Sequence, residues 1–143
     1  MAESTDCIFC TILRGDAPAH RVYEDEHVIA FMDLFPVAKA HTLIVTREHA
    51  ENLFESAPEA IAGVARASIP LARAIRTAFA PDGLGVYQAN GAAAGQTVFH
   101  YHMHLIPQSH GKPLRLHGRT EASAEELAEH AERLRKALAA ESG

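Results

Sequence analysis

The amino-acid sequence predicts a single domain of the α+β class. Its 143 residues match the size of one ordinary domain, and 48% of them are hydrophobic while 22% are charged, as in soluble globular proteins. Short segments rich in β-branched residues follow one another closely, and two longer segments carry apolar residues at helical spacing. Strands that are close in sequence, with helices packed on them, are typical of this class.

The first third of the chain predicts one short helix and three strands. The helix spans Cys7 to Leu13 and ends at Arg14-Gly15-Asp16. Val22 to Glu24 and Val28 to Met32 read as two strands joined by a tight turn, and Thr42 to Val45 as a third.

A long helix is predicted from Pro58 to about Phe79. Ser56 and Glu59 have the spacing of a capping box, and proline is tolerated in a first helical turn. Pro70 lies inside this segment and is expected to kink or split the helix. One apolar stripe runs along the segment: Ile61, Val64, Leu71, Ile75 and Phe79.

Two further strands and a C-terminal helix complete the predicted domain. Leu84 to Gln88 is the fourth strand, and Phe99 to Pro107 contains the fifth. Ser123 to Glu126 forms a second capping box, which opens a helix with leucines along one stripe. Five histidines are expected to be mostly solvated, in loops or on a helix surface: His20, His27, His110, His117 and His130.

Charge and hydropathy exclude several classes of function. The net charge of −5 argues against a nucleic-acid-binding surface, which is usually basic. We expect no membrane association, because no stretch approaches the ~20 apolar residues that span a bilayer, and the polar N-terminus does not resemble a signal peptide. We therefore expect a cytoplasmic protein. Walker-type and Gly-x-Gly-x-x-Gly phosphate loops are missing from the sequence.

Three histidines alternate along the fifth predicted strand. His100, His102 and His104 are expected to share one face, since alternate residues of a strand point the same way. An ordinary half-buried strand would use serine, threonine or lysine at such positions more often. Three imidazoles in a row indicate a need for a metal ligand, a proton carrier or a nucleophile.

A run of small residues leads directly into these histidines. Ala92 to Gly95 would let a ligand approach backbone N–H groups, which can form an anion-binding nest, and Gln96 and Thr97 add polar side chains. An anion cradle beside neutral imidazole suits nucleophilic attack on phosphorus, with a phosphoramidate bond to the ring.

The pattern His-φ-His-φ-His-φ-φ, here His100 to Ile106, resembles the signature of the histidine triad (HIT) superfamily. Gly95 to Val98 and the pair of Phe31-Met32-Asp33 with His41 also resemble this family, in its bacterial Hint- and Fhit-like members. The likeness covers a core of residues 7–107, followed by a C-terminal extension, residues 108–143. It implies an antiparallel sheet of about five strands, a long helix and a C-terminal helix, which dimerise into a larger sheet.

The resemblance also implies a role for each matching residue. His102 attacks the α-phosphorus, while His104 and the backbone from Gly95 through Gln96 to Thr97 hold the phosphate oxygens. Asp33 accepts hydrogen bonds from the ribose, and His41 supports the histidine row. Asn90 resembles a polar residue on the phosphate side, and five side chains would wall the base pocket: Ile8, Phe9, Ile12, Phe31 and Leu34.

The two cysteines raise the question of a metal. Cys7 and Cys10 have the spacing at which two thiolates hold one zinc, but a tetrahedral structural site needs two more ligands. Bacterial relatives that this chain resembles use a Cys, Cys, His, His set, which here would add His49 and His100 in a structural zinc site. The cysteines could instead be buried small hydrophobes or a redox pair. The chemistry itself requires no cofactor.

The resemblance predicts a hydrolase or nucleotidyl transferase that acts through a nucleotidyl-histidine intermediate. A purine nucleoside phosphoramidase is the first hypothesis, with hydrolysis of dinucleoside polyphosphates as the alternative. From other classes, we consider a nucleotide-binding or scaffold protein with little turnover, and a metallohydrolase whose triad holds a metal. A homodimer is expected, built through the helix of residues 58–79 and the strand of residues 84–88.

Overall fold

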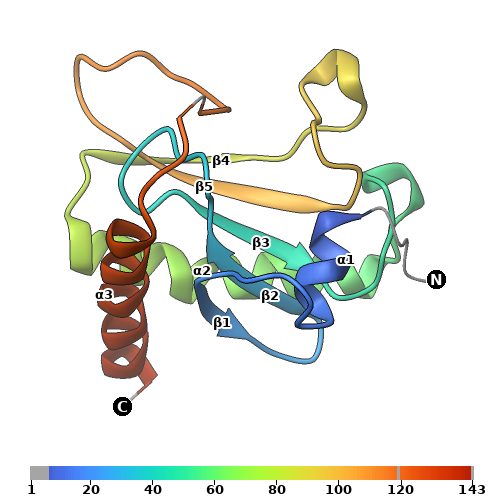
Figure 1. Cartoon of the computed structure of the whole chain (residues 1–143), viewed down its shortest axis with the longest axis horizontal. Helices are drawn as coiled ribbons and strands as arrows, with labels where there is room; N and C mark the ends of the chain where they lie inside the picture. The colour runs from blue at the N-terminus through green and yellow to red at the C-terminus, as the bar shows by residue number, and fades with distance from the viewer. Residues whose placement is uncertain (1–6, 119, 143) are drawn as a thin grey trace.

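A five-stranded antiparallel sheet with helices on both faces forms the body of the protein. The structure, a computed structural model, describes residues 7–118 and 120–142. The strands lie in the order β1-β2-β3-β5-β4 (Figure 1). Their bounds are Arg21–Glu24 for β1, Val28–Met32 for β2, Thr42–Thr46 for β3, Gly83–Tyr87 for β4 and His102–Gln108 for β5. The expected α+β class and sheet are confirmed.

Helices cover the two faces of the sheet differently. The short α1 (Ile8–Leu13) packs on one face and the long α2 (Pro58–Phe79) on the other, while α3 (Ala124–Ser142) contacts α2 and β1. The described residues also include two short 3-10 helices, η1 (Leu53–Glu55) and η2 (Ala92–Ala94). No helix among the described residues combines the length and hydropathy that a bilayer span requires.

Burial on both faces explains why β2 and β3 are apolar almost throughout. Ile29 and Phe31 pack with α1, whereas Ala30 and Met32 pack with α2. All five residues of each strand are buried, so neither shows the polar alternation of a strand with one face in water.

The pairing of β3 with β5 places two triad histidines on the α1 face. Leu43 pairs with His104 and Val45 with His102, and paired residues lie on the same face of a sheet. Leu105 belongs to the opposite core, against α2, as expected from alternation. His100 lies in the bend before β5, which begins only at His102, yet its ring also lies on the α1 face, 5.8 Å from the ring of Phe9 between centroids. The three histidines therefore share this face as expected, although only His102 and His104 do so as strand residues.

The start and middle of α2 also differ from expectation. The Ser56 hydroxyl donates to the Asn52 carbonyl at 2.7 Å, and Ala57 is the N-cap without a side-chain bond, so no capping box forms there. Pro70 does not split the helix. Ala67 and Leu71 on either side of it are buried in the same core, and this packing offsets the backbone hydrogen bond that the proline removes.

The start of α3 agrees with expectation, but one of its histidines does not. The Ser123 hydroxyl accepts the N–H of Glu126 at 3.1 Å, as a cap should. His130 is buried, not solvated, and its ring meets that of Phe79 at 5.3 Å between centroids. Helix α3 contacts both α2 and β1, so the helix face that is buried is wider than the leucine stripe.

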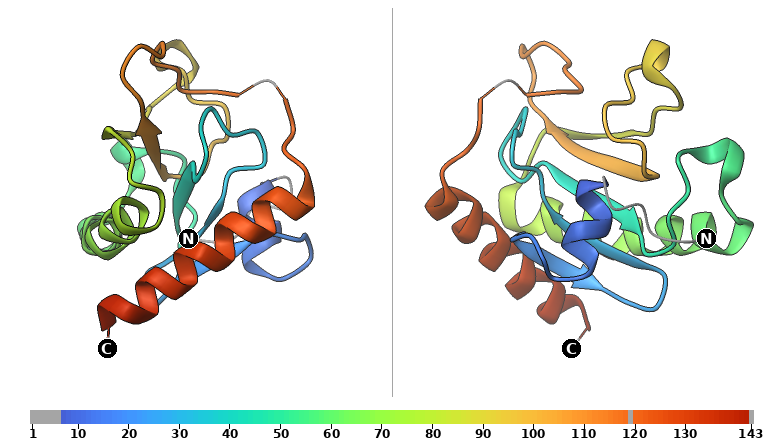
Figure 2. Two further views of the ribbon diagram at one scale, coloured as in Figure 1. Left: turned by 90° about the vertical axis from the view of Figure 1, so that its left-hand side faces the viewer. Right: turned by 45° about the vertical axis from the view of Figure 1, so that its right-hand side comes forward.

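Segments far apart in sequence meet beyond the ends of β4 and β5. Figure 2 shows that the chain leaves β5 over the top of the sheet before it returns to α3, on the same side as the loop that precedes β5. These two loops border the site described below.

Candidate functional site

A pocket of about 320 Å³ opens on the α1 face of the sheet, within the range of small-molecule sites. The five residues expected to wall a base pocket all line it: Ile8, Phe9, Ile12, Phe31 and Leu34. Four of the polar residues expected at the site line the same pocket: Asp33, Thr97, His102 and His104. One pocket therefore offers an apolar slot for a flat ring and, beside it, imidazole groups.

The ring of His102 is held in one tautomer. Its Nδ1 lies 2.7 Å from the carbonyl oxygen of His100, and since a carbonyl only accepts, Nδ1 is the donor. Burial lowers the pKa of His102, which favours the neutral ring. A neutral ring with its proton on Nδ1 keeps the lone pair of Nε2 free. Phe9 fixes the ring further by an edge contact, 5.0 Å between centroids.

A chain of hydrogen bonds sets the tautomer of His104. The backbone N–H of Val37 donates to Nδ1 of His41 at 3.1 Å, so the proton of a neutral His41 sits on Nε2. That Nε2 lies 3.0 Å from Nδ1 of His104, which must accept, and the proton of His104 is therefore on its own Nε2. Burial lowers the pKa of His41 to about 4 and that of His104 to about 3. His104 thus has an N–H available for an anionic oxygen.

Asp33 fixes the neighbouring loop and lies beside this chain. Its Oδ1 accepts the N–H of Phe35 at 2.8 Å, and its Oδ2 lies 3.3 Å from Nε2 of His41. Asp33, His41 and His104 bring ligand atoms within 4.8 Å of one another. They do not form a metal site, because the bond from Val37 leaves His41 with a proton, not a lone pair, on the nitrogen that faces the group.

The loop before β5 uses its polar groups mainly to hold its own shape. Gly95 has a φ of +100°, which favours glycine, and its N–H donates to the Ala92 carbonyl at 3.0 Å. The N–H of Gln96 donates to the Gly91 carbonyl at 3.1 Å, and the Gln96 amide bonds to Gly91 and Val98. Gly95 and Gln96 therefore brace the loop, and Thr97 is the residue of this trio that lines the pocket.

The structure does not bring Asn90 to the pocket. Its Oδ1 accepts the N–H of Leu53 at 2.8 Å and the amide of Gln88 at 2.7 Å. These bonds tie the end of β4 to η1, a structural task.

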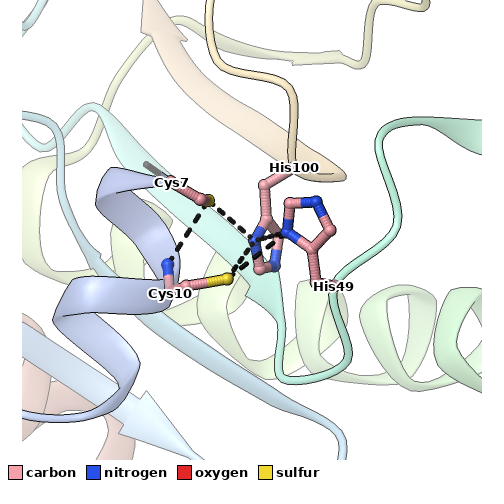
Figure 3. A group of neighbouring side chains, drawn as sticks. All are labelled: Cys7, Cys10, His49 and His100. Atoms are coloured by element: carbon pink, nitrogen blue, oxygen red, sulfur yellow. Dashed lines mark hydrogen bonds between the residues drawn. The ribbon is translucent and has the colours of Figure 1, made fainter. Parts of the chain in front are cut away.

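Cys7, Cys10, His49 and His100 converge beside α1, and Figure 3 shows their side chains turned toward one another. Nδ1 of His100 lies 3.3 Å from the sulfur of Cys7 and 3.6 Å from that of Cys10. The two Nδ1 atoms are 3.1 Å apart, and Cys10 is 3.3 Å from His49. A tetrahedral zinc would place sulfur and nitrogen ligands about 3.5 Å apart and two nitrogens about 3.3 Å apart. The four atoms fit that geometry.

The bonds around His100 favour the same role. Its Nε2 donates to the Thr46 carbonyl at 2.7 Å, so Nδ1 of the neutral ring carries a lone pair toward the cysteines. Burial raises the pKa of the Cys7 thiol, an effect that a bound cation would offset. The backbone carbonyl of this same residue orients His102, so the cysteine cluster and the pocket share one residue.

Several pocket residues had no signal in the sequence. Pro18, Ala19, Leu43 and Val98 add to the apolar wall. His117 also lines the pocket while its side chain stays exposed, as expected; its Nε2 donates to the carbonyl of Gly95 at 2.7 Å. No local pattern marks such residues, because only the return of the chain brings them to the site.

Comparison with known proteins settles the family. A family model described as the HIT domain matches residues 14–111. The chain belongs to the HIT family. Among its relatives, Protein hit of Bacillus subtilis is 50% identical over 103 residues, which cover 72% of this chain and 71% of that protein. Adenylylsulfatase HINT3 of Arabidopsis thaliana is 37% identical over 103 residues, covering 72% of this chain and 52% of that protein.

A solved structure extends the likeness to nearly the whole of this HIT protein. A Zn-bound histidine triad family protein from Mycobacterium smegmatis has a TM-score of 0.85 and 37% identity, and the match covers 98% of each chain. The family includes hydrolases and nucleotide-binding proteins. Both the fold and the resemblance identified in the sequence are thereby confirmed.

Proposed function

We propose that this HIT protein hydrolyses purine nucleoside phosphoramidates at the α-phosphorus, with His102 as the nucleophile. The observation that carries the proposal is the bond from Nδ1 of His102 to the His100 carbonyl. It leaves an unprotonated Nε2 in a pocket that is also lined by apolar side chains and by His104, whose N–H is free to donate.

The geometry supports a two-step mechanism. Nε2 of His102 attacks the α-phosphorus, a bond from nitrogen to phosphorus forms, and the bond to the leaving amine breaks with its electron pair going to the amine, which takes up a proton from solvent. His104, as a donor, stabilises charge on a phosphoryl oxygen. Water then attacks the nucleotidyl-His102 intermediate, which releases a nucleoside monophosphate and returns the imidazole to its neutral form.

The apolar wall supports a nucleoside as the bound group. Phe9 and Phe31 meet at 5.6 Å between centroids, and both line the slot, where a purine would contact ring and aliphatic surfaces. Asp33 lines the same pocket, and its carboxylate would accept hydrogen bonds from ribose hydroxyls.

Two alternatives differ from this proposal in the leaving group or in whether the protein turns over a substrate. Dinucleoside polyphosphates would use the same nucleophile and slot but release a nucleotide. The relative named adenylylsulfatase indicates that sulfate is a further leaving group to test. A nucleotide-binding or scaffold protein with little turnover would keep the slot without needing the oriented Nε2 of His102.

The decisive experiment compares wild type with His102→Ala. Release of nucleoside monophosphate is measured from adenosine phosphoramidate, diadenosine polyphosphates and nucleotide sugars. The variant should lose turnover and keep nucleotide affinity within roughly tenfold, about 1.4 kcal/mol. Activity of the variant near that of wild type would refute His102 as nucleophile, and wild type inactive on every substrate would favour the binding role.

We further propose that Cys7, Cys10, His49 and His100 hold a structural zinc. All four ligands come from the protein, so such a zinc would pin α1 to the sheet and leave the chemistry to the histidines. Support comes from the ligand distances and from the Zn-bound relative. Metal analysis of untagged protein purified without chelator should give one zinc per chain, and a stoichiometry near zero would refute the site.

A homodimer and a cytoplasmic location complete the proposal. β4 is an edge strand of the sheet, and Val86 on it is 52% exposed, as is Ile69 of α2 at 53%. Pairing of two such edges would join two sheets into one. Light scattering at micromolar concentration should give twice the mass of the chain.

Cysteines kept free in the reducing cytoplasm suit a zinc site.

A further inference from the structure

The C-terminal extension borders the substrate pocket. The family match ends at residue 111, yet His117 and Gly118 line the same pocket as His102 and His104. We call residues 117, 118 and 120–122 the strap. The shared HIT domain thus supplies the nucleophile, while the strap supplies part of the wall around it.

Hydrogen bonds and close packing hold the strap on the pocket rim. Nε2 of His117 donates to Gly95 at 2.7 Å, and the N–H of Ala122 donates to the Leu34 carbonyl at 2.9 Å. Between them, Gly118 lies so close to the neighbouring backbone that an added Cβ would collide with the carbonyl oxygen of Phe35. Leu34 and Phe35 are themselves pocket residues, so the strap is attached to the wall it completes.

His117 stands beside His104 in the pocket. Its ring lies 6.0 Å from that of His104, and its anchor Gly95 belongs to the loop that leads to Thr97. Most of the residues that wall the base slot belong instead to α1 and β2. A nucleotide with its base against α1 and β2 and its α-phosphorus at His102 would direct its leaving group toward His104 and His117.

The hydrogen bond to Gly95 determines which ring nitrogen of His117 can accept a hydrogen bond from a ligand. A carbonyl oxygen only accepts, so Nε2 carries the proton, and Nδ1 of the neutral ring is an acceptor. An amine that leaves from phosphorus has N–H groups to donate to this nitrogen. A sulfate leaving group, which is fully ionised, presents only acceptor oxygens to it.

From this arrangement we propose that His117 forms a subsite for the leaving group and selects leaving amines over acidic leaving groups. The inference rests on the proposed function for the position of the nucleotide. It assigns the choice of leaving group to the extension, outside the segment that the family shares.

Binding measured without turnover tests the subsite. In a His102→Ala background, the Kd of an adenosine phosphoramidate with a primary-amine leaving group is compared with that of adenylyl sulfate, before and after adding His117→Ala. Loss of one hydrogen bond should weaken the amine ligand by about threefold to tenfold and change the sulfate ligand less than twofold. His110→Ala is the matched control, because His110 is exposed in the same extension and bonds to Asp82 through its backbone N–H.

A second variant displaces the strap without removing the imidazole. Gly118→Ala places a methyl group against Phe35 and should move His117 away, with the same selective loss for the amine ligand. Thermal unfolding checks that the variant is folded.

The outcomes separate this inference from the proposed function. Equal changes for both ligands, or no change for the amine ligand, would overturn the subsite. Failure of wild type to release nucleoside monophosphate, with the selective loss still present, would instead overturn the hydrolase and retain the subsite. Absence of binding by either ligand would overturn both.

Discussion

Replacing His41 provides a sharp test of the hydrogen-bond chain behind the triad. His41 is fully buried, and its Nε2 fixes the proton of His104 on the nitrogen available to phosphate. His41→Ala leaves Nδ1 of a nearly buried His104 without this donor, which should lower the free energy of unfolding by about 1–3 kcal/mol. The His104 ring is then free to place its proton on Nδ1, and its donor toward the phosphoryl oxygen is lost.

The expected kinetic effect is larger than the loss of stability suggests. Removing one preorganised donor to a developing anionic oxygen typically costs about 100-fold to 1000-fold in kcat. Because the other tautomer of His104 stays accessible in His41→Ala, we expect a fall of about 30-fold to 100-fold in kcat with little change in KM. His41→Gln is the matched control, since its amide N–H can still donate to His104, and it should recover most of the activity.

Two measurements decide the matter. Turnover of adenosine phosphoramidate gives kcat and KM, and ¹⁵N NMR of the imidazole nitrogens reports which nitrogen of His104 carries the proton. If the proton of His104 stays on Nε2 in His41→Ala, or if His41→Gln is as inactive as the alanine variant, the reasoning is wrong.

Three further predictions follow from the same contacts. Burial holds the pKa of His41 at about 4 and that of His104 at about 3, both below the unfolded value of about 6.5, so the folded protein binds fewer protons than the unfolded chain. The free energy of unfolding should therefore be highest above pH 6.5 and fall toward pH 4 by about 1.4 kcal/mol per pH unit for each histidine. Denaturant midpoints that stay constant over this pH range would contradict the prediction. Asn90→Ala should lower stability by about 1–2 kcal/mol yet keep kcat/KM within about threefold, so a selective loss of activity would restore Asn90 to the phosphate side. Cys10→Ser should reduce bound zinc and lower the melting temperature, and chelation should then have no further effect on that variant.

The cysteine cluster and the nucleophile are coupled through one residue. His100 directs Nδ1 to the cysteines, and its carbonyl accepts from His102, so any loosening of the cluster reaches the ring that we propose as the nucleophile. This dual contact explains why the triad has unequal members. His102 has a free Nε2 lone pair, His104 has a free N–H, and His100 contacts both the cysteine cluster and His102.

Patterns with a short range were readable from the sequence alone. The apolar runs of β2 and β3, the Ser123 cap of α3 and the stripe of α2 depend on neighbours within a few residues, and each matches the structure closely. The triad, with the residues that resemble the HIT family, also located the apolar wall of the pocket.

Tertiary contacts decided the rest. Pro70 stays within α2 because the core on both sides of it offsets a lost backbone bond. His130 is buried because α3 packs against both α2 and β1. Asn90 does not reach the pocket because its side chain accepts a hydrogen bond from Leu53 of η1.

The sequence by itself determined the fold class and the family and singled out His102 as the proposed nucleophile, because these depend on residue types at fixed spacing. Only the tertiary structure determined the proton on His104, the bracing role of Gln96 and the arrival of His117 at the pocket. A hydrogen bond between residues far apart in the chain has no local signature. Its donor and acceptor are chosen by folding, and in this protein those choices set which nitrogens are free for chemistry.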